Sequence, residues 1–349
     1  MRSKIGENKR KEKNYFVEMC RFVFSICLVF HHCRELGGGR SNFFAGAWIF
    51  VEFFFLISGY YTMKHYDENE SNGEDTGKEA VTYVWKKIRT ILPYAAIGIL
   101  ISVLQIVILE KKNAEWFSLS VSILWNILCL QETCLATYNL NAPMWYITDI
   151  MLFLPLIIIL ILALKDIYKF YLSWLIPIFC YIFLIQNNGT LQFWGGQQMK
   201  VMLSCFLRGI ASMMLGTFVY FWCQKITEIN HEKVKIHVVV KWIFLCGFIY
   251  AVITYDLKKM SMDMIICLLL FLFSIFLAEP VRIPKGIATL CEHLGRLALP
   301  VYLIHRPLIE FFKMMQVSFG LKVFLCLSCT IIVSEMTMGM VNKYYRKKA

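Results

Sequence analysis

Ionisable side chains interrupt an apolar stretch, Tyr15–Cys33, that is long enough to cross a membrane as one helix. Glu18 and Arg21 lie near its start, and His31 and His32 lie at its end. Ionisable groups inside a membrane helix are costly, and they usually face the protein interior or a water-filled cavity. A neutral imidazole can accept a proton from an attacking hydroxyl near neutral pH. The stretch therefore predicts a reaction or transport path in which a histidine titrates.

Helical geometry places Arg21 and His32 on roughly one face of this stretch. Their separation is close to three helical turns, with a rise of roughly 16 Å. His31 points about 100° away from His32. A fixed cation thus lies at one depth and a titratable base at another. The spacing favours His32 as the general base, and His31 is the alternative. An interfacial histidine without a catalytic role is the other interpretation.

The composition is that of a polytopic membrane protein. Of its 349 residues, 58% are hydrophobic and 17% are charged, whereas soluble domains carry about 25% charged residues. The net charge of +12 does not require a nucleic acid, because Lys and Arg accumulate in the cytoplasmic loops of membrane proteins. We expect a lipid bilayer as the surroundings and no nucleic acid partner. The 13 cysteines are scattered through apolar segments, so we expect them to pack as small residues and predict no metal site.

Apolar segments divide the chain into spans joined by short loops. The expected organisation is a basic tail at 1–13, one transmembrane domain at 14–342 and a basic tail at 343–349. Residues 117–131 are shorter than the about 20 residues that a crossing needs, so they predict an interfacial or re-entrant helix. The fold class is all-α, a polytopic transmembrane helical bundle of about ten spanning helices. The expected spans are 14–33, 43–63, 88–109, 144–164, 167–185, 199–222, 238–255, 261–279, 294–315 and 320–342.

Charge counting predicts the orientation. With ten crossings both termini lie on the same side, and most Lys and Arg fall on that side, which the positive-inside rule assigns to the cytoplasm. If 117–131 also crossed, the basic loop at 225–241 would move outside. We therefore expect a multi-pass protein of the cell (inner) membrane with cytoplasmic termini.

A basic cluster near the third span could bind phosphate. It consists of Lys86, Lys87 and Arg89. The fork of an Arg side chain binds phosphate through two hydrogen bonds, so the cluster is a candidate clamp for an anionic cytosolic cofactor. Ser58 and Gly59 at the same expected face would allow close backbone approach, and Arg21 would extend the positive lining. Anchoring by snorkelling side chains is the other interpretation of the cluster.

Glu52 lies inside the second span. It could orient a catalytic histidine, or it could form a structural ion pair with Arg21 or Arg208. Both interpretations stay open, because buried ion pairs occur in either role.

Further candidates lie near the expected outer face and, in the case of His305, around mid-depth. Asp149 follows Trp145 and Tyr146, an aromatic pair that is either an interfacial anchor or a surface for a sugar. His305 lies two residues before Pro307, which should bend its helix. This histidine either lines the same cavity or packs in the core.

Five motifs occur in order along the chain. They are the acid–Arg–His set Glu18, Arg21 and His32; VEFFFLISGY at 51–60; Lys86 and Arg89 before Pro93; Trp145-Tyr146-Ile147; and LGRLALPVYLIHRP at 294–307. The ordered set resembles acyltransferase family 3, membrane-bound and acyl-CoA-dependent O-acyltransferases similar to bacterial glycan O-acetyltransferases. The chain departs from the family where Lys86 replaces an Arg, which keeps the charge but loses the fork.

The resemblance implies that acyl-CoA, usually acetyl-CoA, is the cytosolic donor. The acceptor would be a hydroxyl of an outward-facing glycan or lipid-linked sugar of the cell envelope. The implied general base is His32, and Glu52 or Glu18 would support His32 or Arg21 electrostatically. The implied donor contacts are Arg21, Lys86, Arg89, Ser58 and Gly59, and the implied acceptor contacts are Trp145, Tyr146, Asp149 and His305.

Two other functions are compatible with the same residues. Proton-coupled transport of a polar or anionic solute also uses intramembrane Glu, Arg and His, although the chain lacks the repeat pair from which many carriers are built. A membrane sensor or assembly factor would tolerate the loss of Arg21 or His32.

Overall fold

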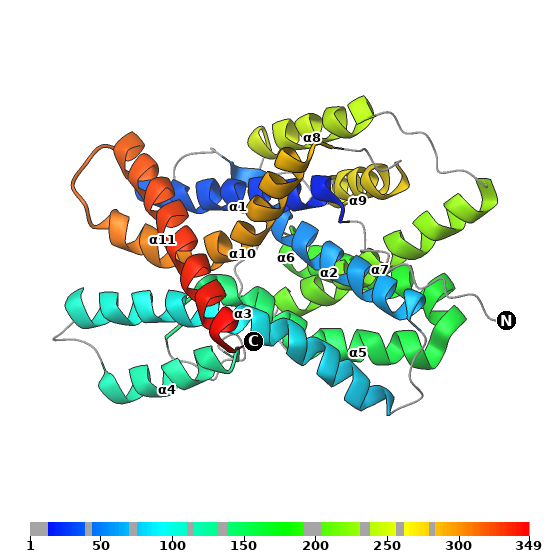
Figure 1. The fold of residues 1–349 in the computed structure, drawn as a ribbon, viewed down its shortest axis with the longest axis horizontal. Helices are drawn as coiled ribbons and strands as arrows, with labels where there is room; N and C mark the ends of the chain where they lie inside the picture. Colours follow the sequence, from blue (N-terminus) through cyan, green and yellow to red (C-terminus); the bar gives the residue numbers. More distant parts are fainter. Residues whose placement is uncertain are drawn as a thin grey trace.

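The computed structural model describes residues 13–38, 44–69, 75–109, 115–130, 138–191, 204–230, 238–255, 262–278 and 283–348. Within these ranges the chain is helical and forms no strand, which confirms the predicted all-α class. The α-helices are α1 (Tyr15–Cys33), α2 (Ile49–Glu68), α3 (Thr76–Leu109), α4 (Trp116–Ile127), α5 (Trp145–Ile167), α6 (Ser173–Asn188), α7 (Ser204–Asn230), α8 (Val238–Ile253), α9 (Met262–Leu277), α10 (Lys285–Lys313) and α11 (Phe319–Lys348) (Figure 1). Short helices at their ends are η1 (Arg34–Gly37), η2 (Ala45–Trp48), η4 (Ala142–Met144) and the π-helix η5 (Tyr168–Leu172).

The protein is a multi-pass membrane protein. In the described part of the chain, 7 helical stretches are long and apolar enough to cross a membrane. One of them, Ala142–Asn188, has 47 residues, a length of roughly 70 Å that exceeds twice the thickness of a bilayer core. It breaks at Lys165, whose φ of 38° is not helical. Helices α8 and α9 are shorter, with 16 residues each. The predicted polytopic bundle is confirmed, while the predicted number of ten crossings stays a prediction.

Helices α1 and α10 lie side by side and run in the same direction (Figure 1). Residue numbers rise together along this pair: Lys13 with Glu292, Ser25 with Ala298, and His32 with His305. The face of α1 that carries Glu18, Ser25 and His32 therefore packs against α10.

Helices α2 and α7 form a second parallel pair. Contacts again rise together: Glu52 with Arg208, Gly59 with Met213, and Asp67 with Tyr220. Helix α6 runs antiparallel to α7, as the contacts of Tyr181 with Ser212 and of Asn188 with Ser204 show. These directions fit a chain in which α5 and α6 cross the membrane separately and the 12-residue α4 does not cross.

Close approach of α2 and α7 depends on glycine. A Cβ atom at Gly59 would lie 1.9 Å from the carbonyl oxygen of Met213, and one at Gly216 would lie 2.0 Å from that of Leu56. Small residues let the backbones of membrane helices pack this closely. One face of Gly59 is therefore filled by α7.

Helix α3 begins at Thr76, earlier than the span predicted from residue 88. Ala80, Val84 and Ile88 are buried at helical spacing, so an amphipathic turn extends the helix ahead of its apolar part. The basic cluster at 86–89 consequently lies inside α3, and its side chains point in different directions.

Candidate active site

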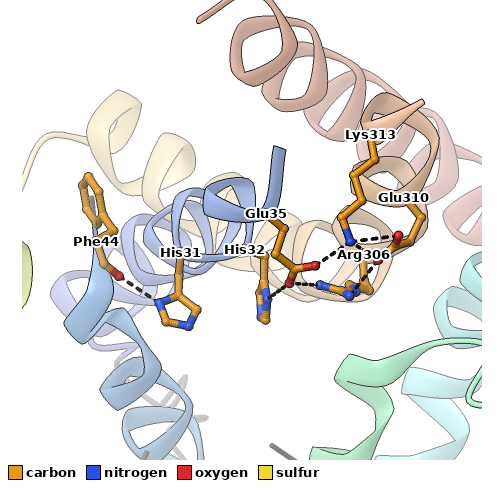
Figure 2. Close-up of polar contacts among 7 residues, drawn as sticks. All are labelled: His31, His32, Glu35, Phe44, Arg306, Glu310 and Lys313. Atoms are coloured by element: carbon orange, nitrogen blue, oxygen red, sulfur yellow. Dashed lines mark hydrogen bonds and ion pairs between the residues drawn. The ribbon is translucent and has the colours of Figure 1, made fainter. Parts of the chain in front are cut away.

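The two histidines end α1 and face different neighbours (Figure 2). Nδ1 of His31 lies 2.8 Å from the carbonyl oxygen of Phe44. A carbonyl oxygen only accepts hydrogen bonds, so this nitrogen carries the proton and Nε2 of neutral His31 keeps its lone pair. The ring of His32 instead faces that of His305, with 5.1 Å between the centroids. The structure thus joins two of the predicted site residues.

Several charged side chains lie on the Nδ1 side of the His32 ring (Figure 2). Nδ1 of His32 lies 3.7 Å from Oε1 of Glu35, one turn further along the chain. Glu35 also accepts hydrogen bonds from Arg306 and, at 2.6 Å, from Lys313. Glu310 bonds the same two cations, at 2.7 Å from Arg306 and 2.9 Å from Lys313. We call His32, Glu35, Arg306, Glu310 and Lys313 the Glu35 cluster.

His305 is fully buried within α10. Its Nδ1 lies 2.7 Å from the carbonyl oxygen of Tyr302 and must donate to it. Nε2 therefore holds a lone pair in the neutral ring, and it has no hydrogen-bond partner among the described residues. Buried polar atoms are normally hydrogen-bonded, so an unpartnered one calls for an explanation such as a bound molecule.

Pro307 ties α10 to the segment before α5. Proline has no N–H, so the carbonyl of Leu303, four residues earlier, loses its helical donor. Nδ2 of Asn141 supplies the missing hydrogen bond at 2.9 Å. The hydroxyl of Tyr302 donates to the carbonyl of Pro143 at 3.0 Å. These bonds fix the turn of α10 that carries His305.

Glu18 and Arg21 lie at the opposite end of α1. Nη1 of Arg21 bonds Oε2 of Glu18 at 3.1 Å, and both side chains are partly exposed. Glu18 packs against Gly295 of α10, where any Cβ would collide with it. Of the two partners expected for Glu18, His32 or Arg21, the structure contains the pair with Arg21. A catalytic role for Glu18 stays a prediction.

The basic cluster of α3 is split between two directions. Lys86 and Arg89 are exposed. Lys87 turns inwards over the ring of Tyr83, at 5.1 Å from its centroid, where its charge interacts with that of Arg21. Lys87 is thus the member of the cluster that faces inwards at this end of α1, as Arg21 does, whereas the donor contacts expected on α3 were Lys86 and Arg89.

Ser58 and Tyr146 meet beside this end of the bundle. Their hydroxyls lie 3.0 Å apart, and the Tyr146 hydroxyl also donates to the carbonyl of Phe54. Tyr146 interacts electrostatically with Arg21. A predicted acceptor contact and two predicted donor contacts are therefore neighbours.

Glu52 forms a buried network with α7. One carboxylate oxygen accepts from Nε of Arg208 and the other from the hydroxyl of Ser212. The Arg208 guanidinium lies 5.5 Å from the ring of Trp48 and 5.2 Å from that of Trp145. We call Glu52, Arg208 and Ser212 the Glu52 network. Of the arrangements expected for Glu52, the structure contains the ion pair with Arg208.

Two predicted acceptor contacts adjoin this network. Trp145 covers Arg208, and Asp149 is fully buried against Gly209 of α7. Both side chains therefore help to hold α5 on α7.

Sequence reasoning did not find Glu35. Glu35 follows His32 by three residues, and on a continuing helix its carboxylate would lie one turn away from the imidazole. The chain does continue as η1 after α1, whereas the predicted span ended at residue 33. An acid at this spacing was the available signal.

The match with known families covers nearly the whole chain. A model of the acyltransferase domain of family 3 matches residues 14–337, which include every residue of the Glu35 cluster and of the Glu52 network. No curated protein and no solved structure matches. Because the family model covers far more than half of a chain that is also a polytopic helical bundle, this membrane protein belongs to acyltransferase family 3.

Proposed function

We propose that this protein is an O-acyltransferase of the cell (inner) membrane, with cytoplasmic termini, that uses cytosolic acyl-CoA. The acyl group, acetyl in the simplest case, would pass to a hydroxyl of an outward-facing glycan or lipid-linked sugar of the cell envelope. Membership of the family supports acyl transfer. The observation that carries the finer proposal is the pair of imidazoles, His32 and His305, whose rings lie 5.1 Å apart.

The proposed step is direct transfer with His32 as general base. Nε2 of His32 takes the proton of the acceptor hydroxyl while the hydroxyl oxygen attacks the thioester carbon. When the tetrahedral intermediate collapses, the carbon–sulfur bond breaks and the thiolate of CoA leaves. The proton on Nε2 then passes to this sulfur, so His32 returns to its neutral form.

On the donor side we assign Arg21 and Lys87 to the phosphates of CoA. Arg21 lies roughly 16 Å along α1 from His32, which is of the order of a pantetheine arm, and Lys87 reaches inwards from α3. Lys86 and Arg89, exposed on α3, would contact the nucleotide outside the bundle. Ser58 completes this side of the proposed path, and the neighbouring Gly59 holds α2 against α7.

On the acceptor side we build the proposal on His305. Its buried Nε2 can accept a hydrogen bond from a hydroxyl of the acceptor. Trp145, Tyr146 and Asp149 were predicted to contact the acceptor directly. Trp145 covers Arg208 and Asp149 is buried. We therefore expect Trp145 and Asp149 to support the residues that line the acceptor site without contacting the acceptor themselves.

The test is transfer of label from radioactive acetyl-CoA to cell-envelope glycan in membrane vesicles containing the full-length protein. Mass spectrometry of the glycan would show the mass of one acetyl group. We expect His32→Ala to lower the rate about 10²–10⁴-fold, the usual contribution of a general base. His65→Ala, at the far end of α2, is the matched control. Full transfer by the His32 variant would contradict the assignment of the base.

A further inference from the structure

The Glu35 cluster contains a carboxylate that faces the proposed base and that neither the family resemblance nor the sequence motifs assigned. We propose that Glu35 is a positioning residue: its carboxylate accepts a hydrogen bond from Nδ1–H of His32 and so holds the ring with the Nε2 lone pair towards the substrate. This inference rests on the proposed function of His32.

The geometry selects Glu35 over the other carboxylates. Its Oε1 lies 3.7 Å from Nδ1 of His32, whereas Glu18 bonds Arg21 and Glu52 bonds Arg208. The separation is longer than a hydrogen bond, and catalytic hydrogen bonds are often long without substrate and tighten in the complex. A small rotation of either side chain would close it, because the two residues lie one turn apart.

Two cations from α10 hold Glu35 in place. Arg306 bonds the oxygen that faces His32, and Lys313 bonds the other oxygen at 2.6 Å. The carboxylate thus joins the end of α1 to α10, the helix that also carries His305. Each imidazole thus has an acceptor at Nδ1 that is tied to α10: Glu35 for His32, and the carbonyl of Tyr302 for His305.

A carboxylate in this position has two effects on a general base. The tautomer of a histidine is set by the hydrogen bond of its other nitrogen, so an acceptor at Nδ1 leaves Nε2 free to take a proton. The negative charge also stabilises the imidazolium that forms when Nε2 takes the hydroxyl proton. Neither effect changes the binding of acyl-CoA at the opposite end of α1.

Glu310 provides a matched control within the same cluster. It binds Arg306 and Lys313, as Glu35 does, but its contacts are with these cations and not with His32. A merely structural role would make the two glutamates equivalent. A positioning role makes only Glu35 important for the rate.

The kinetic test compares Glu35→Gln, Glu35→Asp and Glu310→Gln in the full-length protein, with acetyl-CoA as donor and native membranes as the source of acceptor. We expect Glu35→Gln to lower kcat by about 10–1,000-fold and to leave the KM for acetyl-CoA within about twofold. Glu35→Asp should recover part of kcat, and Glu310→Gln should keep more than half of it. Equal losses from Glu35→Gln and Glu310→Gln would overturn the proposal.

A second measurement needs no activity and separates this inference from the proposed function. The protein is labelled with ¹⁵N-histidine in detergent micelles, and the signals of His32 are identified by their loss in His32→Gln. We expect protonated Nδ1 and bare Nε2 in the wild type, and a larger share of the reverse tautomer in Glu35→Gln. An unchanged tautomer would overturn the role of Glu35. A wild type without acetyl transfer but with this tautomer shift would refute the acyltransferase proposal alone.

Discussion

Two glutamates of this protein bind an arginine from another helix, and their surroundings differ. Glu52 and Arg208 are 0% and 3% exposed, and aromatic rings cover the guanidinium. Glu35 and Arg306 are 27% and 19% exposed, and Lys313, Glu310 and His32 join them. The Glu52 network is closed, that is, enclosed by the protein, whereas the Glu35 cluster is open, that is, partly exposed, and it includes a histidine.

The difference separates a structural ion pair from a candidate catalytic one. Both oxygens of Glu52 are used by α7, so this carboxylate fixes how α2 packs on α7. The oxygens of Glu35 are shared between α10 and His32. A partly exposed carboxylate beside a histidine can affect proton transfer to and from that histidine. A fully buried carboxylate that is paired with an arginine mainly affects stability.

The largest expected effect comes from breaking the closed network. Arg208→Ala would leave the carboxylate of Glu52 buried without its cation, and such a loss costs about 3–5 kcal/mol. We expect the variant to lose most of its monodisperse fraction in detergent and to unfold at a lower temperature. Size-exclusion chromatography and a thermal scan measure both.

The control removes both charges of the pair. Replacing a buried ion pair by apolar residues of similar volume is often close to neutral. The double variant Glu52→Leu, Arg208→Met should therefore be more stable than Arg208→Ala. An Arg208→Ala protein as stable as the wild type would show that the pair does not hold α2 on α7.

The next effect concerns the cationic end of α1. A charge-assisted hydrogen bond contributes about 1.5–3 kcal/mol, so Lys87→Met should raise the KM for acetyl-CoA about tenfold or more. The exposed Lys86 is the matched control, and Lys86→Met should change KM less. Initial rates over a range of acetyl-CoA concentrations measure both values. A larger effect at Lys86 would restore the assignment made from the sequence alone.

Much of this arrangement was predictable because it depends on local pattern. Apolar length located the helices, and the spacing of Arg21 and His32 gave the two ends of the proposed path. The ion pair of Glu52 with Arg208 was one of the three arrangements stated for Glu52. Residues 1–12 of the basic amino-terminal tail lie outside the described residues.

The remaining part depends on which helices become neighbours, which one sequence does not reveal. Glu35 is important because α10 brings Arg306 and Lys313 to it. Lys87 turns inwards over Tyr83 because α3 buries Val84 and Ile88, which sets the rotation of the helix. Gly59 was predicted to approach a ligand, and the structure shows that it approaches the backbone of α7.

A smaller loss is expected at that helix contact. In Gly59→Ala the new methyl group would lie 1.9 Å from the Met213 carbonyl, and overpacking of this kind costs about 1–3 kcal/mol. Gly247→Ala on α8 is the control, since a Cβ there meets nothing within 4 Å. Thermal unfolding of the two variants compares them directly. Equal stability would mean that α2 and α7 can separate without cost.

The smallest effect is expected where a charged pair is most exposed. Nε2 of His293 on α10 lies 2.7 Å from Oε1 of Glu335 on α11, and both side chains are 40% exposed. Exposed pairs contribute about 0–1 kcal/mol, because water and salt screen them. We therefore expect His293→Gln to change the unfolding temperature by at most a few degrees and to keep acetyl transfer. Adding salt should change the wild type and the variant alike. A loss as large as that of Arg208→Ala would show that exposure does not rank the charged pairs of this protein, and the distinction between its closed and open clusters would then lack an energetic basis.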